Sequence, residues 1–146
     1  QQLVAESLGK SSKGVLPIIS DMPKDNHSLM QLYLDGNKNC FFTFFDVIDA
    51  NSPKIKNKIL DDFKYLKGHS LQSIKLAQKQ ATQSVFKAKK IPFRSFEILK
   101  RNEETLGELF TFFMLETILL GKMMKINPFD QPAVELIKKE TKKVLV

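Results

Sequence analysis

The chain has 146 residues, of which 42% are hydrophobic and 27% charged, a composition typical of one globular domain with its own core. A single cysteine, Cys40, excludes an internal disulfide framework. Its position beside Phe41 and Phe42 favours a buried thiol in a reducing compartment. The net charge of +7 allows nucleic-acid binding, but the lysines are spread over every predicted helix, which favours a solvated surface.

Neither a membrane span nor a targeting segment is expected. The most apolar stretch, 109–120, is too short to cross a bilayer and contains Glu116. The first residues contain neither a basic region nor an apolar one, so we expect no signal peptide. The chain also lacks an initiator methionine, from which we expect it to begin inside a longer one.

Apolar periodicity and helix breakers predict four elements in the first third of the chain. They are a helix end at 1–10, an edge strand or extended loop at 15–19, a helix at 25–35, and a buried strand at 40–48. Asp25 or Asn26 is expected to cap the second helix, and Gly36 to end it. The 40–48 segment is apolar on both faces, as strands of parallel sheets are.

The rest of the chain continues the alternation of helices and strands. The predicted elements are amphipathic helices at 54–66 and 70–89, a strand at 92–99, a helix at 102–124 and a last helix that Asp130 caps. The 102–124 helix is apolar nearly all round and should lie in a core. This order predicts an α/β domain with a mostly parallel sheet. Two or three strands are few for such a sheet, so further elements are expected upstream.

Three side chains could carry acid–base chemistry. Glu6 lies in an apolar helix end and could act as a base, although a lone glutamate on a helix is usually solvated. His27, at the start of a predicted helix, could accept a proton or be an ordinary surface histidine. Lys138 shares a helix face with Val134 and is expected to point inward, or to extend its ammonium to water along that face.

Other sites are not indicated. His69 lies in a predicted loop without a partner motif and is expected to be structural or incidental. The sequence contains no glycine-rich phosphate loop and no CxxC or HExxH motif. One cysteine and two distant histidines give no metal-ligand cluster, so we expect neither a metal nor a cofactor.

Three segments, in order, resemble the glucose-6-phosphate isomerases. Residues 5–10, AESLGK, resemble the family's Glu-Ser-x-Gly-Lys motif. Residues 25–36, DNHSLMQLYLDG, resemble its second histidine motif. Residues 121–138, GKMMKINPFDQPAVELIK, resemble its long C-terminal signature. Because the matches reach both ends of the chain, the whole chain resembles the C-terminal part of the proteins of this family.

The resemblance assigns roles to individual residues. It places Glu6 at the catalytic base, His27 at the histidine that assists sugar ring opening, and Lys138 at the signature lysine that works with it. Gln2 and Gln131 fall on glutamines that line the sugar-phosphate site. The family's arginine and most of its phosphate-binding loop would lie upstream of Gln1.

The resemblance also implies a fold and an activity. The fold is a sugar-isomerase (SIS) domain, a flavodoxin-like three-layer sandwich around a five-stranded parallel sheet. Residues 1–146 would form most of the second such domain, incomplete at its N-terminal side, with the C-terminal helices. The implied activity is the interconversion of glucose 6-phosphate and fructose 6-phosphate by a cytoplasmic homodimer. The alternatives are a non-catalytic sugar-phosphate-binding SIS module and, more remotely, a basic nucleic-acid binder.

Overall fold

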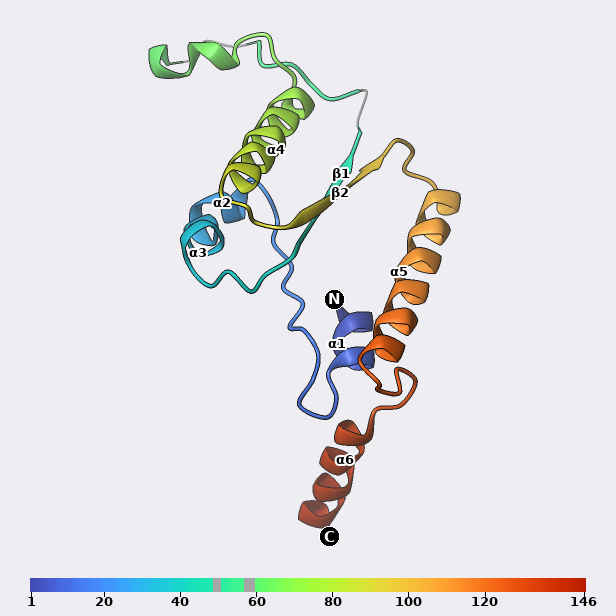
Figure 1. Ribbon diagram of the computed structural model, residues 1–146. Helices are drawn as coiled ribbons and strands as arrows, with labels where there is room; N and C mark the ends of the chain where they lie inside the picture. Colours follow the sequence, from blue (N-terminus) through green and yellow to red (C-terminus); the bar gives the residue numbers. More distant parts are fainter. Residues whose placement is uncertain (49–50, 57–59) are drawn as a thin grey trace. The chain divides into compact units, whose positions relative to one another are not determined.

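The computed structural model describes residues 1–48, 51–56 and 60–146 of the chain (Figure 1). These residues form two compact units. The first unit joins Gln1–Ile19 to Glu103–Val146, and the second is Ser20–Asn102.

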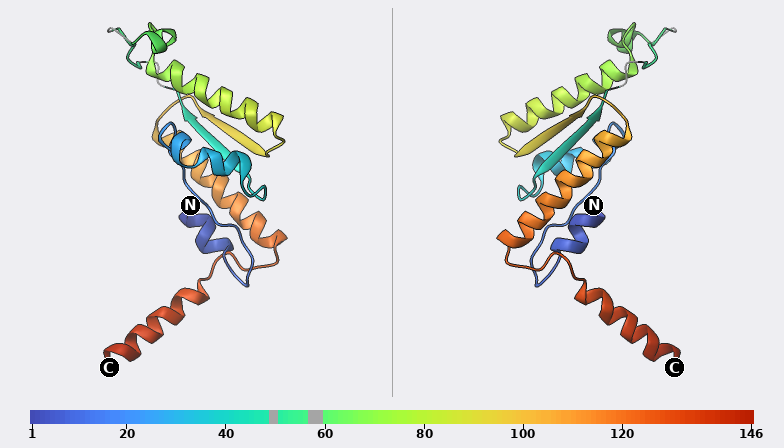
Figure 2. Two further views of the ribbon diagram at one scale, coloured as in Figure 1. Left: turned by 90° about the vertical axis from the view of Figure 1, so that its left-hand side faces the viewer. Right: turned by 90° about the vertical axis from the view of Figure 1, so that its right-hand side faces the viewer.

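A parallel pair of strands forms the centre of the second unit. Strand β1 (Phe42–Val47) pairs with β2 (Phe93–Ile98), with Phe42 opposite Phe93 and Val47 opposite Ile98. Helix α4 (Leu71–Ala88) lies between them in sequence and covers one face of the pair (Figure 2). The predicted α/β class with parallel strands is therefore confirmed, and the fold is consistent with part of a SIS-like domain.

Aromatic rings join α4 to the strands. Phe86 of α4 is 1% exposed, and its ring lies 4.9 Å from Phe42, 5.6 Å from Phe44 and 6.1 Å from Phe93 in edge-on contacts. Edge-on packing of this kind adds to the free energy of burying the rings. On the other face of the pair Phe45 stacks on Phe96 and is 52% exposed. The expected burial of β1 on both faces is therefore wrong for Phe45, because α4 covers only one face.

A buried ion pair lies beneath α4. Asp46 of β1 is 6% exposed, and its carboxylate lies 3.6 Å from Lys79 Nζ, which also lies 3.3 Å from Glu97 of β2. Asp46 follows Phe42 and Phe44 at alternate positions, so it faces α4 with them. A charge in this layer needs a partner, and Lys79 reaches it from the helix.

The predicted helix at 25–35 is two short helices. Helix α2 spans Lys24–Ser28 and α3 spans Met30–Asp35, with a break at Leu29. Gly36 ends α3 as predicted. The predicted cap at Asp25 or Asn26 is wrong, because Pro23 holds that position. Asp25 lies inside α2 and its carboxylate accepts hydrogen bonds from Asp21 N–H at 2.6 Å and Ser28 Oγ at 2.9 Å.

The predicted helix at 54–66 is mostly wrong. Lys54 forms an isolated antiparallel bridge with Ser70, and Ile55 N–H donates to the His69 carbonyl at 3.0 Å. A short 3-10 helix, η1, follows at Asp61–Leu66, while residues 57–59 lie outside the described part. The extended backbone pairs with the segment before α4, an interaction that local periodicity does not reveal. The contact of His69 with Ile55 is made by its backbone, so the expectation for its side chain stays a prediction.

Three helices make up most of the first unit: α1 (Gln2–Leu8), α5 (Glu103–Met123) and α6 (Pro132–Leu145). Helix α1 packs against α5, with Leu8 1% and Thr117 2% exposed. Near the end of α5, a Cβ on Gly121 would lie 3.1 Å from the Pro128 ring, so this position suits a glycine. The 15–19 segment is extended without strand pairing, one of its two predicted forms.

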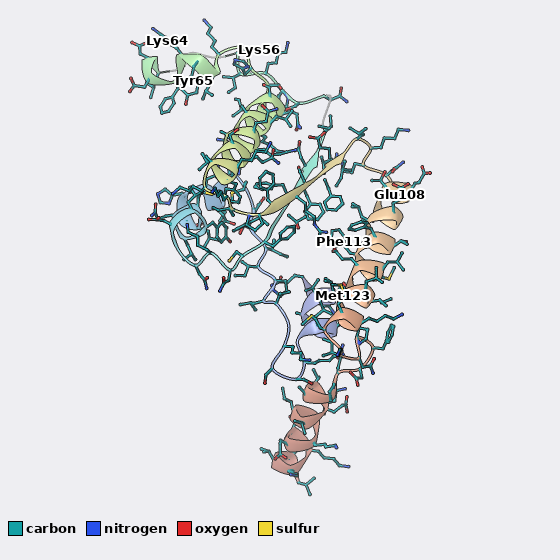
Figure 3. The ribbon with its side chains drawn as sticks, viewed as in Figure 1. Lys56, Lys64, Tyr65, Glu108, Phe113 and Met123 are labelled. Carbon is teal, nitrogen blue, oxygen red and sulfur yellow. The ribbon has the colours of Figure 1, made fainter. Side chains whose placement is uncertain are left out.

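Helix α5 is apolar nearly all round, as predicted, yet much of it is exposed. Side chains project from several sides of the helix, with Phe113 and Met123 labelled in Figure 3. Phe110 is 60% exposed, Leu119 60% and Met123 78%. The predicted place in a core is therefore wrong for these side chains. Among the described residues, no helix combines the length and apolar character needed to span a bilayer.

Cys40 is exposed, so the prediction of a buried thiol is wrong. The residue precedes the first paired position of β1 at Phe42 and therefore lies outside the layer that α4 covers. The neighbouring phenylalanines indicated a continuous buried run, but burial begins only where the strand is paired.

Candidate active site

Helix α1 carries two of the predicted site residues side by side. Gln2 and Glu6 are one turn apart, and Gln2 Nε2 donates a hydrogen bond to Glu6 Oε1 at 2.9 Å. Leu8 anchors the helix to α5, and Glu6, two positions earlier, lies on the opposite, exposed side. The amide therefore orients a carboxylate that remains open to a ligand.

A lysine joins the N-terminal motif to the C-terminal signature. Lys10 Nζ donates to the Asn127 carbonyl at 2.6 Å and to Asp130 Oδ1 at 2.9 Å, and its side chain is only 9% exposed. Lys13 Nζ adds a hydrogen bond to the Met124 carbonyl at 2.9 Å. These contacts hold the loop between α5 and α6 against the chain that follows α1. Two motifs about 120 positions apart in sequence thus meet in one unit.

The predicted capping role of Asp130 is wrong, because its carboxylate binds Lys10 instead. Gln131 holds the N-cap position of α6 without a side-chain cap, and Pro132 begins the helix as predicted. The hydrogen bond from Lys10 is the main reason that the pKa of the Asp130 carboxyl is lowered from its ordinary value. Gln131, a predicted substrate-binding residue, therefore follows directly after the residue that Lys10 holds.

Lys138 does not point inward in this chain. Its side chain is 66% exposed and forms an ion pair with Glu135 of the same helix at 2.6 Å. None of the described residues of α6 is buried, and Ile137 remains 69% exposed. The amphipathic pattern of the helix is present, but the first unit provides no surface that covers it. The inward-facing prediction is wrong here for that reason.

His27 lies in the last turn of α2, in the second unit, and is exposed, so its predicted place at the start of a helix is wrong. Asp25 fixes the turn before it through its bonds to Asp21 and Ser28. The backbone hydrogen bond from Asp21 is the main cause of the lowered pKa of the Asp25 carboxyl. His27 therefore projects from a locally held turn. Its geometry relative to Glu6 and Lys138, which belong to the first unit, stays a prediction.

The structure thus brings together the α1 residues and the start of the C-terminal signature. Sequence reasoning missed the joining role of Lys10, although Lys10 ends the Glu-Ser-x-Gly-Lys motif and that motif was the available signal. Among the residues that the structure describes, no group of three or more His, Cys, Asp or Glu side chains could hold a metal ion.

Comparisons with known proteins agree with these motifs. The chain is 37% identical over 141 residues to a probable glucose-6-phosphate isomerase of Methanococcus maripaludis, covering 94% of this chain and 31% of that protein. It is 39% identical over 152 residues to a glucose-6-phosphate isomerase of Mycoplasmopsis pulmonis, covering 99% of this chain and 35% of that protein. The chain therefore spans about a third of the length of these relatives. No protein-family model matches it.

A solved structure shares the fold. A crystal structure of a hypothetical protein from Thermus thermophilus superimposes with a TM-score of 0.88 at 29% sequence identity, covering 99% of this chain and 37% of that one. The fold is that of an α/β protein and is consistent with part of a sugar-isomerase domain. The chain is similar over nearly its whole length to about a third of these glucose-6-phosphate isomerases, and its three motifs predict that this third is the C-terminal one.

Proposed function

We propose that this chain forms the C-terminal portion of a longer cytoplasmic enzyme that interconverts glucose 6-phosphate and fructose 6-phosphate as a homodimer. The observation that carries the proposal is the contact of Lys10 with Asn127 and Asp130. It joins the motif of Glu6 to the signature of Gln131 and Lys138, so two segments with separate predicted roles belong to one local structure.

The proposed reaction has two stages. The cyclic sugar first opens when a proton passes from the C1 hydroxyl to the ring oxygen, and His27 with Lys138 would assist that transfer. Glu6 then removes the proton at C2, which the neighbouring carbonyl makes acidic, and returns it to C1 through an enediol. The hydrogen bond from Gln2 holds the Glu6 carboxylate in one orientation.

Other parts of the proposed site lie outside these residues. The developing oxyanion needs a positive partner. The resemblance assigns this task to an arginine upstream, with the phosphate-binding loop, and completes the histidine site across subunits. The exposed state of Lys138 and of the apolar face of α6 supports this proposal, because both remain available for a surface that this chain does not provide.

The alternative is a sugar-phosphate-binding module without catalysis. Such a module requires the phosphate loop but no carboxylate held for proton transfer. The paired Gln2 and Glu6 favour the enzyme, because an amide that fixes one carboxylate oxygen serves orientation of a base. A module would bind sugar phosphate without exchanging the C2 hydrogen with solvent.

The test is a Glu6→Gln substitution in the complete polypeptide. The amide keeps the size of the side chain but cannot accept the C2 proton, so turnover should fall by about 100- to 10,000-fold, typical of losing a general base. Proton NMR of glucose 6-phosphate deuterated at C2 measures exchange, and calorimetry measures binding. Binding should remain nearly intact.

A matched control is Glu108→Gln on the exposed surface of α5, which should leave exchange unchanged (Figure 3). Normal exchange in Glu6→Gln with intact binding would show that another group is the base. Binding without any exchange in the unsubstituted protein would favour the non-catalytic module.

A further inference from the structure

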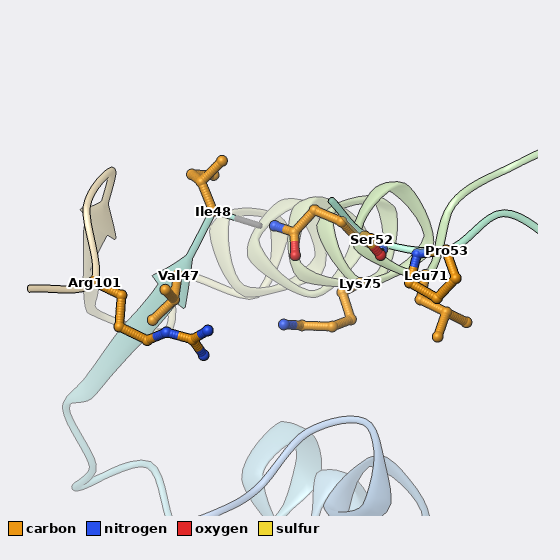
Figure 4. Close-up of a pocket in the computed structure, with 8 residues that line it drawn as sticks. Val47, Ile48, Ser52, Pro53, Leu71, Lys75 and Arg101 are labelled. Carbon is orange, nitrogen blue, oxygen red and sulfur yellow. The ribbon is translucent and has the colours of Figure 1, made fainter. Parts of the chain in front are cut away.

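A hollow lies at the carboxyl end of the strands, and its lining includes no residue to which the motifs assign a role. It has a volume of about 420 Å³ and lies within the second unit (Figure 4). Its polar lining consists of Ser52, Gln72, Lys75 and Arg101. Ligands of open α/β sheets bind at this edge, beyond the carboxyl ends of the strands.

Two cations face each other across this hollow. The side chain of Lys75 projects from α4, and that of Arg101 projects from the loop after β2, each toward the other (Figure 4). Neither side chain has an ion-pair partner among the residues that the structure describes. Like charges repel at close range, so this arrangement favours an anion between them.

A buried amide adds a donor at the same place. Gln72 lines the hollow, is 8% exposed, and its Nε2 has no hydrogen-bond partner within the described part of the chain. A buried polar group without a partner costs free energy, and an acceptor in the hollow would remove that cost. The wall of the hollow thus provides two charged donors and one neutral donor.

The backbone of α4 forms a rigid support but contributes few free donors. Leu71 N–H donates to the Pro53 carbonyl at 3.0 Å, Gln72 N–H to Ser52 Oγ at 2.8 Å, and Ser73 N–H to Ser70 Oγ at 3.0 Å. The first turn is therefore already bonded. Binding of an anion would depend on the side chains, with the positive end of the helix dipole as a weaker addition.

We propose that this hollow is a phosphate-binding site that shares no lining residue with the proposed active site and that takes the phosphate group of a small phosphorylated metabolite. Lys75 and Arg101 pair with the phosphate oxygens, and the Gln72 amide donates to one of them. The hollow is large enough for more than a bare ion. Its apolar lining, which includes Val47 and Leu71, would contact the carbon skeleton of an ester. The inference does not depend on the isomerase activity.

The test uses the complete polypeptide labelled with 15N-glutamine. The side-chain amide signal of Gln72, assigned by its absence in Gln72→Leu, reports on the hollow directly. Inorganic phosphate and glycerol 3-phosphate should both shift this signal, the ester at lower concentration, and glycerol should not. Lys75→Gln and Arg101→Gln should each weaken binding by about 10- to 100-fold, the usual cost of one charged hydrogen bond.

A matched control is Lys87→Gln at the other end of α4, which should leave the shifts unchanged. Glu6→Gln should also leave them unchanged, so failure of the isomerase proposal and failure of this one are distinguishable. Tighter binding of inorganic phosphate than of the ester would overturn the ester assignment. No saturable shift at millimolar phosphate, or equal shifts in the Lys75 and Arg101 variants, would overturn the site itself.

Discussion

Phe86 offers the sharpest test of how the second unit is held together. Its side chain is 1% exposed and contacts the rings of Phe42, Phe44 and Phe93 from α4. Phe86→Ala would leave a cavity between a helix and two paired strands. Because paired strands cannot easily move inward, the cavity would remain largely open, and the cost should be about 3 to 5 kcal/mol.

The effect is large against the total stability of a domain, about 5 to 15 kcal/mol. With a urea dependence of roughly 2 kcal/mol per molar, the midpoint of unfolding should fall by roughly 2 M. Circular dichroism during urea titration measures it. Val85→Ala is the matched control, because Val85 is the preceding residue of α4 and is 41% exposed. Its cost should stay below about 1 kcal/mol. Equal shifts for the two variants would refute the view that the ring cluster holds α4 on the strands.

Three further predictions concern the first unit and the chain as a whole. Because Lys10 lowers the pKa of Asp130, their contact stabilises the loop at pH values above the unfolded-state pKa of that carboxyl, and this stabilisation is lost as the pH falls through the folded-state pKa. In Lys10→Met, an NMR titration should show the pKa of Asp130 returning toward its ordinary value. An unchanged titration would contradict the assignment. Gly121→Ala should destabilise the unit by about 1 to 3 kcal/mol, because its Cβ would lie 3.1 Å from Pro128 and the ring must move, whereas an unchanged melting temperature would show that the loop yields freely. The 146 residues alone should show no isomerase turnover and should self-associate through apolar surfaces such as that of α5; a monodisperse monomer by light scattering, with normal turnover, would refute the proposal that the chain is part of a larger enzyme.

Local pattern was sufficient for the central elements of the second unit. The apolar runs predicted β1 and β2 to within two residues at each end, and the periodicity of 70–89 predicted α4, which begins after Ser70. The apolar side chains of these elements pack against one another, so the apolar pattern of each element corresponds to the face that is covered. The three motifs likewise identified the related enzymes, because motif spacing is a property of the sequence itself.

Other features depended on partners distant in sequence. Asp130 had the residue type and position of a helix cap, but Lys10 binds its carboxylate from the far end of the chain. Lys138 lies on an amphipathic helix, but a face of that helix is buried only where another surface packs against it. None of the described residues of α6 is buried. The pairing of Lys54 with Ser70 replaced a predicted helix in the same way.

The sequence by itself thus determined the alternation of helices and strands, the class of related enzymes and the residues to which catalytic roles can be proposed. Only the tertiary structure showed that Lys10 joins the two terminal motifs and that Lys75 and Arg101 face each other at the edge of the strands. Periodicity records which face of an element is apolar, because burial selects for it. It does not record which distant charges meet, since that depends on how the elements pack in three dimensions.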